Sequence, residues 1–267
     1  MSPVVAVLGA WILFGGSHLL LSTPMLRERA VNRLGQHGFL LFYALITTTS
    51  LGLLIAAVAR YGGDGPPGAN LGNVLVARWA LGATALVGAL LLVAGLMNYT
   101  RSPMAVLARR WRASTETKGK PLPARALVER ITRHGFFVGL AILMAAHALL
   151  ASTLTGAVFF SGFVLMVLIG IPMQDRKLLE RHGKTYGDYL SRTSVVPFAT
   201  TPGSPGDANQ RVWPTIAIAV SGAVVLAALH PLWNLGHGAP FVVIVLIGGL
   251  AGIVKQYLAA NSTSSDP

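Results

Sequence analysis

The feature that most constrains this chain is a series of apolar stretches, each close to the length that crosses a lipid bilayer. A membrane-spanning α-helix needs about 20 mostly apolar residues. The seven stretches of this kind are Val4–Leu21, Phe39–Ala59, Trp79–Met97, Phe136–Thr153, Val158–Met173, Pro214–Leu232 and Phe241–Leu258. Because lipid offers no hydrogen-bond partners, a lone spanning segment satisfies its own backbone as a helix. We therefore predict an all-α, integral membrane helical bundle of seven transmembrane helices, or of six if the last stretch is re-entrant or interfacial.

The composition favours a membrane protein over the soluble classes. Apolar residues make up 53% of the chain and charged residues 11%, whereas an ordinary soluble domain is about 25% charged. This balance disfavours a soluble enzyme, a nucleic-acid-binding protein and a disordered chain, and it makes membrane lipid the expected partner. The chain also contains no cysteine, which excludes thiolate nucleophiles, thiolate metal sites and the covalent attachment of c-type haem.

The cations predict the topology. Of the 21 lysines and arginines, 18 fall in the connections after the first, third and fifth stretches, Arg60 falls in another connection, and Arg78 and Lys255 lie at helix ends. Because cytoplasmic connections carry the excess of Lys and Arg, we place the N-terminus outside a bacterial inner (cytoplasmic) membrane. Residues 1–261 are expected to form one transmembrane domain and residues 262–267 a disordered tail. The connection Gly62–Gly68 is rich in Gly and Pro, which predicts a flexible connector.

Histidines are the ionisable groups expected at membrane depth, because the predicted spans contain no Asp or Glu. Ionisable groups at this depth are candidates for function. His18 follows Gly15 on the same helical face, and His147 lies among small residues. Two imidazoles on two helices suit axial ligation of a haem iron. From the residues alone, a hydrogen bond to a carbonyl or hydroxyl of a neighbouring helix is the favoured alternative.

His134 is set apart from this pair because it begins the fourth stretch. It lies about 20 Å along the helix from His147, so both cannot ligate one iron. Together with Arg133 it is expected to be an interfacial anchor or an anion contact. The segment Asp175–Phe198 alternates charges of opposite sign at helical spacing, which predicts an ordered segment with i,i+4 ion pairs.

The stretch 130–198 resembles the NnrU family, which includes plant and cyanobacterial 15-cis-zeta-carotene isomerases. The matching elements are Arg-Ile-Thr-Arg-His at 130–134, Gly139, Ala146-His147, Asp175-Arg176, Arg181-His182-Gly183, Tyr186 and the run 192–198. Looser matches are Ser17-His18, Tyr43, Ser50-Leu51 and His230-Pro231-Leu232. The block 130–198 is the specific part of the resemblance.

This resemblance implies a haem b membrane protein with His18 and His147 as the iron ligands, and it reverses the order of the two interpretations above. Given such a haem, Arg133 or Arg176 could bind its propionates, because guanidinium binds carboxylate in a bidentate manner. Ordinary interfacial anchoring is an equally good interpretation of either arginine. The reaction implied is a redox-gated cis–trans isomerisation of a polyene. The same iron position would suit nitric oxide in place of an apolar substrate.

Two alternatives stay open. Membrane methyltransferases of the isoprenylcysteine type share Arg133-His134, Gly139, Gly183, Tyr186 and Tyr189. They differ where a Pro, a Tyr and a Glu pair are expected, since Gly135 follows His134 and Asp175-Arg176 replaces the Glu pair. This makes adenosylmethionine-dependent methyl transfer the second interpretation. The third is a non-catalytic membrane factor in nitrite or nitric oxide metabolism.

Overall fold

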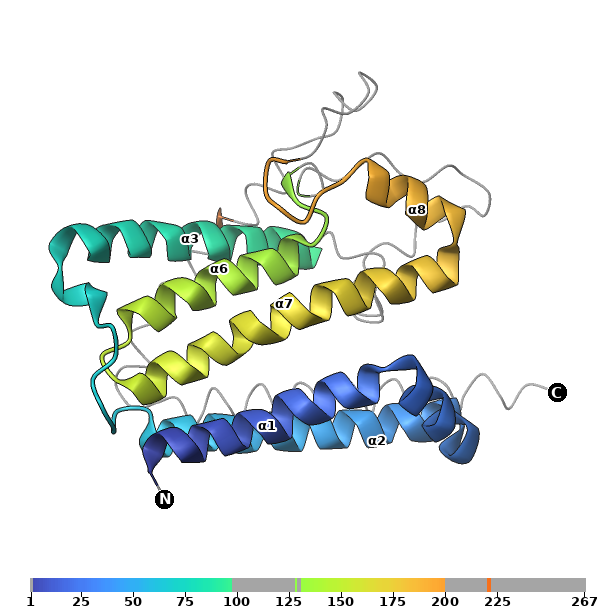
Figure 1. The fold of residues 1–267 in the computed structure, drawn as a ribbon, viewed down its shortest axis with the longest axis horizontal. Coiled ribbons are helices and arrows are strands. Elements are labelled where there is room, and N and C mark those ends of the chain that lie inside the picture. The colour runs from blue at the N-terminus through green and yellow to red at the C-terminus, as the bar shows by residue number, and fades with distance from the viewer. Residues whose placement is uncertain (1, 98–127, 129–130, 200–219, 222–267) are drawn as a thin grey trace. The chain divides into compact units, whose positions relative to one another are not determined.

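The computed structural model describes residues 2–97, 128, 131–199 and 220–221. Within these ranges the chain forms helices and no β-strand (Figure 1). The elements are α1 (Pro3–Ser22), α2 (Pro24–Tyr61), the short 3-10 helix η1 (Leu71–Asn73), α3 (Leu75–Met97), α6 (Gly135–Leu150), α7 (Leu154–His182) and α8 (Lys184–Ser191). The all-helical class predicted from the sequence is confirmed for these residues.

Four of these helices contain segments long and apolar enough to cross a membrane. The segments are Pro3–Ser22, Pro24–Tyr61, Leu75–Gly95 and Leu154–Glu180. The fourth predicted span is the 16-residue helix α6, which at about 24 Å is shorter than a hydrocarbon core of about 30 Å. The sixth and seventh predicted spans lie outside the described residues, apart from 220–221. The number of seven spans and the orientation of the N-terminus therefore stay predictions.

Two helices extend well beyond the apolar stretches that predicted them. Helix α2 begins at Pro24 rather than Phe39, and it is interrupted at Gly35, whose φ of 70° is a conformation that side chains disfavour. Helix α7 continues past Met173 to His182. In both cases polar residues extend the helix beyond the apolar run, before it in α2 and after it in α7, because charge ends a hydropathy window without ending backbone hydrogen bonding.

The described residues fall into two units, which are considered separately. In the first unit, whose described residues are 2–72 and 148–162, α1 and α2 form an antiparallel hairpin (Figure 1). Thr23 alone joins them in an extended conformation, which the following Pro24 favours. The indole of Trp11 on α1 donates to the carbonyl oxygen of Phe159 at 3.1 Å. Gly162 allows this approach, because a Cβ there would overlap the Trp11 ring.

The connection after α2 is held in place by hydrogen bonds, in contrast to the flexible connector predicted. Leu154 N donates to Pro66 O at 2.7 Å, and Gly68 N donates to Ser152 O at 2.9 Å. The hydroxyl of Thr155 is fully buried and donates to the carbonyl oxygen of Asp64 at 2.6 Å. The Gly and Pro residues of 62–68 indicated a connection between helices, but they gave no sign of partners some 91 residues further along the chain.

In the second unit, whose described residues are 73–97, 128, 131–147, 163–199 and 220–221, α3 and α6 approach closely through glycines (Figure 1). A Cβ at Gly88 would lie 2.6 Å from the backbone nitrogen of Leu143, and one at Gly139 would lie 2.7 Å from the carbonyl oxygen of Gly88. Small residues commonly allow such contacts between membrane helices. Val138 of α6 packs against Val167 and Ile171 of α7, which completes the core of this unit.

Candidate functional site

His18 lies at the C-terminal end of α1 and contacts the neighbouring helix α2. Its Nδ1 is 3.1 Å from the hydroxyl of Tyr43, and the two ring centroids are 5.7 Å apart. The ring of Phe14, which is 6% exposed, lies one turn earlier at 5.8 Å from the imidazole. Ser22 contacts both residues. Its hydroxyl donates to the carbonyl oxygen of His18 at 2.6 Å and lies 3.4 Å from the hydroxyl of Tyr43.

His147 lies near the end of α6, and its hydrogen-bond partner belongs to the same helix. Its Nδ1 is 2.8 Å from the carbonyl oxygen of Leu143, one turn earlier. A carbonyl oxygen only accepts, so Nδ1 donates and the lone pair of the neutral ring lies on Nε2. Metal-ligating histidines commonly donate their second nitrogen to such an oxygen. His18 belongs to the first unit and His147 to the second, and ligation of one iron by both stays a prediction.

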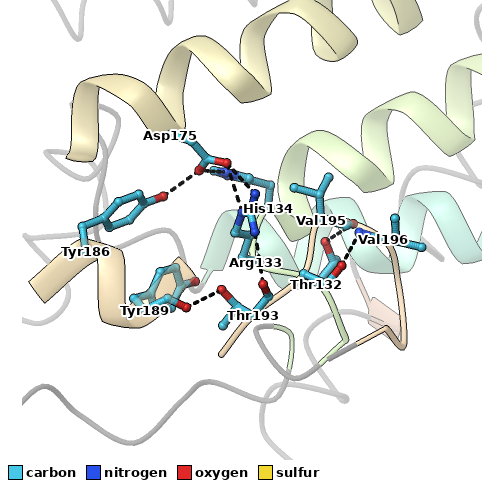
Figure 2. Close-up of polar contacts among 10 residues, drawn as sticks. Thr132, Arg133, His134, Asp175, Tyr186, Tyr189, Thr193, Val195 and Val196 are labelled. Atoms are coloured by element: carbon cyan, nitrogen blue, oxygen red, sulfur yellow. Dashed lines mark hydrogen bonds and ion pairs between the residues drawn. The ribbon is translucent and has the colours of Figure 1, made fainter. Parts of the chain in front are cut away.

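A second candidate site is centred on the carboxylate of Asp175 in α7 (Figure 2). Arg133 donates from Nε and Nη2 to Oδ2 at 3.1 and 2.7 Å. His134 Nε2 and the Tyr186 hydroxyl each lie 2.7 Å from Oδ1. We call Arg133, His134, Asp175 and Tyr186 the Asp175 cluster. It joins the segment before α6 to α7 and α8, and with His134 only 5% exposed it is largely shielded from solvent.

The electrostatics of the Asp175 cluster are those of one anion surrounded by donors. The charge of Arg133 balances that of Asp175, as a buried carboxylate requires. Burial and the adjacent Asp175 carboxylate raise the pKa of Tyr186 far above its usual range. The phenol therefore stays protonated and acts as a donor. The charges are internally paired, which suits a structural joint between helices better than a reactive centre.

Backbone hydrogen bonds extend this joint along the segment after α8. Arg133 N donates to Ser194 O at 2.9 Å, and Phe198 N donates to Ile131 O at 2.9 Å. The buried hydroxyl of Thr132 donates to Val195 O at 2.8 Å. The expected order of the segment Asp175–Phe198 is confirmed, since the residues that precede α6 hold its end in place (Figure 2).

The remaining predicted site residue, Arg176, lies outside the Asp175 cluster. Its Nε donates to Glu180 at 2.9 Å, and the two side chains are 80% and 49% exposed. This is the i,i+4 pairing that the charge pattern predicted. Arg133 is engaged by Asp175 and by the carbonyl oxygen of Thr193. A role of either arginine toward a haem propionate stays a prediction.

Sequence reasoning missed the partners of His134 and His18. His134 was expected to be an anchor or an anion contact, and the anion is Asp175, 41 residues away. The available signal was the rarity of carboxylates, because an acidic residue at the end of an apolar stretch needs a partner. Tyr43 and Ser22 carried no such signal, since hydroxyl side chains are common in helices.

These features define the class of protein: an all-helical membrane protein with helix-borne histidines and a buried ionic joint at the end of α7. The model of the NnrU protein family matches residues 6–243, and the chain belongs to that family.

Two curated relatives share a shorter segment. They are the chloroplastic 15-cis-zeta-carotene isomerases of Arabidopsis thaliana, 36% identical over 72 residues, and of Zea mays, 38% identical over 72 residues. The matched segment covers 27% of this chain and only 20% of each relative. No solved structure matches the chain.

Proposed function

We propose that this protein is a membrane haem b protein in which His18 and His147 would hold the iron, and that it catalyses a redox-gated cis–trans isomerisation of a polyene. The observation that carries the proposal is the setting of the two imidazoles. Each lies on an apolar helix with Nδ1 against an uncharged oxygen, the Tyr43 hydroxyl or the Leu143 carbonyl. The family and its isomerase relatives support the choice of reaction.

The donor set fits the group that the family implies. Haem iron accepts imidazole nitrogen, and a partner oxygen at Nδ1 fixes the ring orientation and raises the basicity of Nε2. His134 does not fit as a ligand, because its Nε2 is bound to the Asp175 carboxylate. Only His18 and His147, of the described histidines, combine a membrane helix with a neutral oxygen partner at Nδ1.

A bound haem would supply a redox-active iron that acts as a Lewis acid when it is ferrous. The chain itself would hold that group and exclude water. Phe14 and Phe39, 6% and 3% exposed, bury the region around His18 and Tyr43. Leu20, two residues after His18, is 58% exposed, as expected for a helix surface that faces lipid. An apolar polyene suits such a site, because isomerisation needs no water and no carboxylate relay.

The test is the absorption spectrum of the purified protein in detergent, oxidised and reduced, with the haem content of four variants. We expect a Soret band and sharp reduced bands. His18→Ala and His147→Ala should each lower haem content or change the spin state. His37→Ala and His182→Ala are the controls and should leave both unchanged.

Two results would overturn this proposal. One is retention of haem by both His18→Ala and His147→Ala, which would remove the ligand assignment. The other is binding of adenosylmethionine by a colourless protein, which would favour methyl transfer.

A further inference from the structure

Three side-chain groups contact one another at the junction of α1 and α2. The Ser22 hydroxyl, the Tyr43 hydroxyl and His18 Nδ1 follow one another at 3.4 and 3.1 Å. The Ser22 hydroxyl also donates to the carbonyl oxygen of His18 at 2.6 Å. These contacts therefore form a closed ring of three residues, Ser22, Tyr43 and His18.

Counting the available hydrogens assigns a donor and an acceptor to each of these contacts. Each hydroxyl carries one hydrogen. The hydrogen of Ser22 is used on the His18 carbonyl, so Ser22 accepts in its contact with Tyr43. For each of these contacts to contain a hydrogen, the hydrogen of Tyr43 must lie toward Ser22 at 3.4 Å, and Tyr43 then accepts in its contact with His18 at 3.1 Å. The remaining donor is His18 Nδ1–H, and the lone pair of the neutral ring lies on Nε2.

The backbone explains why His18 needs a partner on another helix. His147 donates to the carbonyl four residues earlier, Leu143. The equivalent carbonyl for His18 is that of Phe14, which already accepts from the Ser17 hydroxyl at 3.1 Å. An α-helical carbonyl also accepts from the backbone four residues on, so both lone pairs of Phe14 O are engaged.

We propose that Tyr43 and Ser22 are positioning residues that hold His18 in the Nδ1–H tautomer and so present Nε2 for ligation. The importance of that tautomer rests on the proposed function, in which His18 is an iron ligand. The position of the His18 ring proton does not depend on haem, because it is set by the residues of this chain. Neither residue is a catalytic residue, because each acts through His18.

The first readout is independent of haem. Full-length protein with ¹⁵N-labelled histidine is purified from haem-deprived cells, and the ring nitrogens of His18 are observed by NMR in detergent, assigned with His18→Ala. We expect a protonated Nδ1 in the wild type. Tyr43→Phe and Ser22→Ala should each populate the Nε2–H tautomer. Thr47→Val is the matched control, because the Thr47 hydroxyl also bonds a carbonyl one turn back, at 2.7 Å, with no contact to His18.

The second readout is haem binding and the reduction potential of the loaded protein. Loss of an outer partner of a metal ligand commonly costs about 10- to 100-fold in affinity, and we expect this range for Tyr43→Phe. Its reduction potential should rise, because a less basic imidazole stabilises ferric iron less. Ser22→Thr keeps a hydroxyl and should restore wild-type behaviour, while Thr47→Val should change neither quantity.

The two possible failures are distinguishable. A wild-type His18 that carries its proton on Nε2 would overturn this inference whether or not haem binds. So would an unchanged tautomer in both Tyr43→Phe and Ser22→Ala. A wild type that takes up no haem would refute the proposed function, and the NMR signal would still decide where the His18 proton lies.

Discussion

Replacing Asp175 by alanine is expected to release the segment that follows α7. The carboxylate accepts from Arg133, His134 and Tyr186, with its shortest contact to each at 2.7 Å. The change removes the common acceptor of three donors that come from two other parts of the chain. Arg133 is then left beside the carbonyl of Thr193 without its counter-charge.

The size of the effect follows from burial. Removing one partner of a buried ion pair costs about 3–5 kcal/mol. The side chains of Asp175 and Arg133 are 13% and 18% exposed, so partial hydration of the arginine places the cost near the lower end. A cost of about 3 kcal/mol multiplies the population of the opened segment by roughly 150.

Limited proteolysis of inverted membrane vesicles measures this population. Cleavage between residues 184 and 198 follows the open fraction when opening and closing are fast relative to cleavage. Glu180→Ala is the matched control on the same helix, because it removes an exposed pair with Arg176 worth at most about 0.5 kcal/mol. Cleavage of Asp175→Ala at a rate within about threefold of Glu180→Ala would refute the reasoning, since the predicted costs differ by at least about 2 kcal/mol.

Three further predictions concern packing, pH and topology. Gly88→Ala should destabilise the protein by about 1–3 kcal/mol in thermal unfolding, because a Cβ there meets the backbone of α6, whereas Gly82→Ala, which meets nothing within 4 Å, should be neutral or stabilising. The raised pKa of Tyr186 stabilises the folded state fully below about pH 10, the ordinary tyrosine value, and this contribution should fall at higher pH in the wild type but not in Tyr186→Phe. Reporter fusions test the topology: we expect an outside signal after Pro66 and Thr155 and an inside signal after Lys118 and Pro205, and any reversed pair would contradict it.

Hydropathy predicted α1, α2, α3, α6 and α7, because one property, apolar length, decides whether a segment can remain in lipid. Hydropathy could not predict how far these helices continue beyond their apolar stretches. Helix α2 begins at Pro24 and α7 runs to His182, since polar residues there continue the helix beyond the apolar stretch. The glycine contacts between α3 and α6 were also missed, because spacing alone does not show which helix lies opposite.

The candidate site was predictable only as far as residue type and depth allowed. Helical rise placed His134 about 20 Å from His147, and in the structure His134 contacts Asp175 just before α6. The partners of the histidines depend on which helices meet. Tyr43 is 25 residues from His18, and Asp175 is 41 residues from His134. Contacts of that kind are fixed by tertiary packing, which one sequence does not encode in any local pattern.

His134, which directly precedes α6, and His147, which lies within α6, offer the sharpest separation of structure from function. His134 is bound to a carboxylate in the Asp175 cluster, while His147 donates to its own helix. His134→Ala should therefore accelerate cleavage of residues 184–198 and leave haem content unchanged.

His147→Ala should do the reverse, because its Nδ1 donates to the carbonyl oxygen of Leu143, within its own helix. The two variants carry the same substitution, one just before α6 and one within it, so general damage to α6 would move both readouts together. Haem loss in His134→Ala without haem loss in His147→Ala would identify His134, and not His147, as the ligand. It would refute the view that neutral oxygen partners mark the iron ligands of this chain.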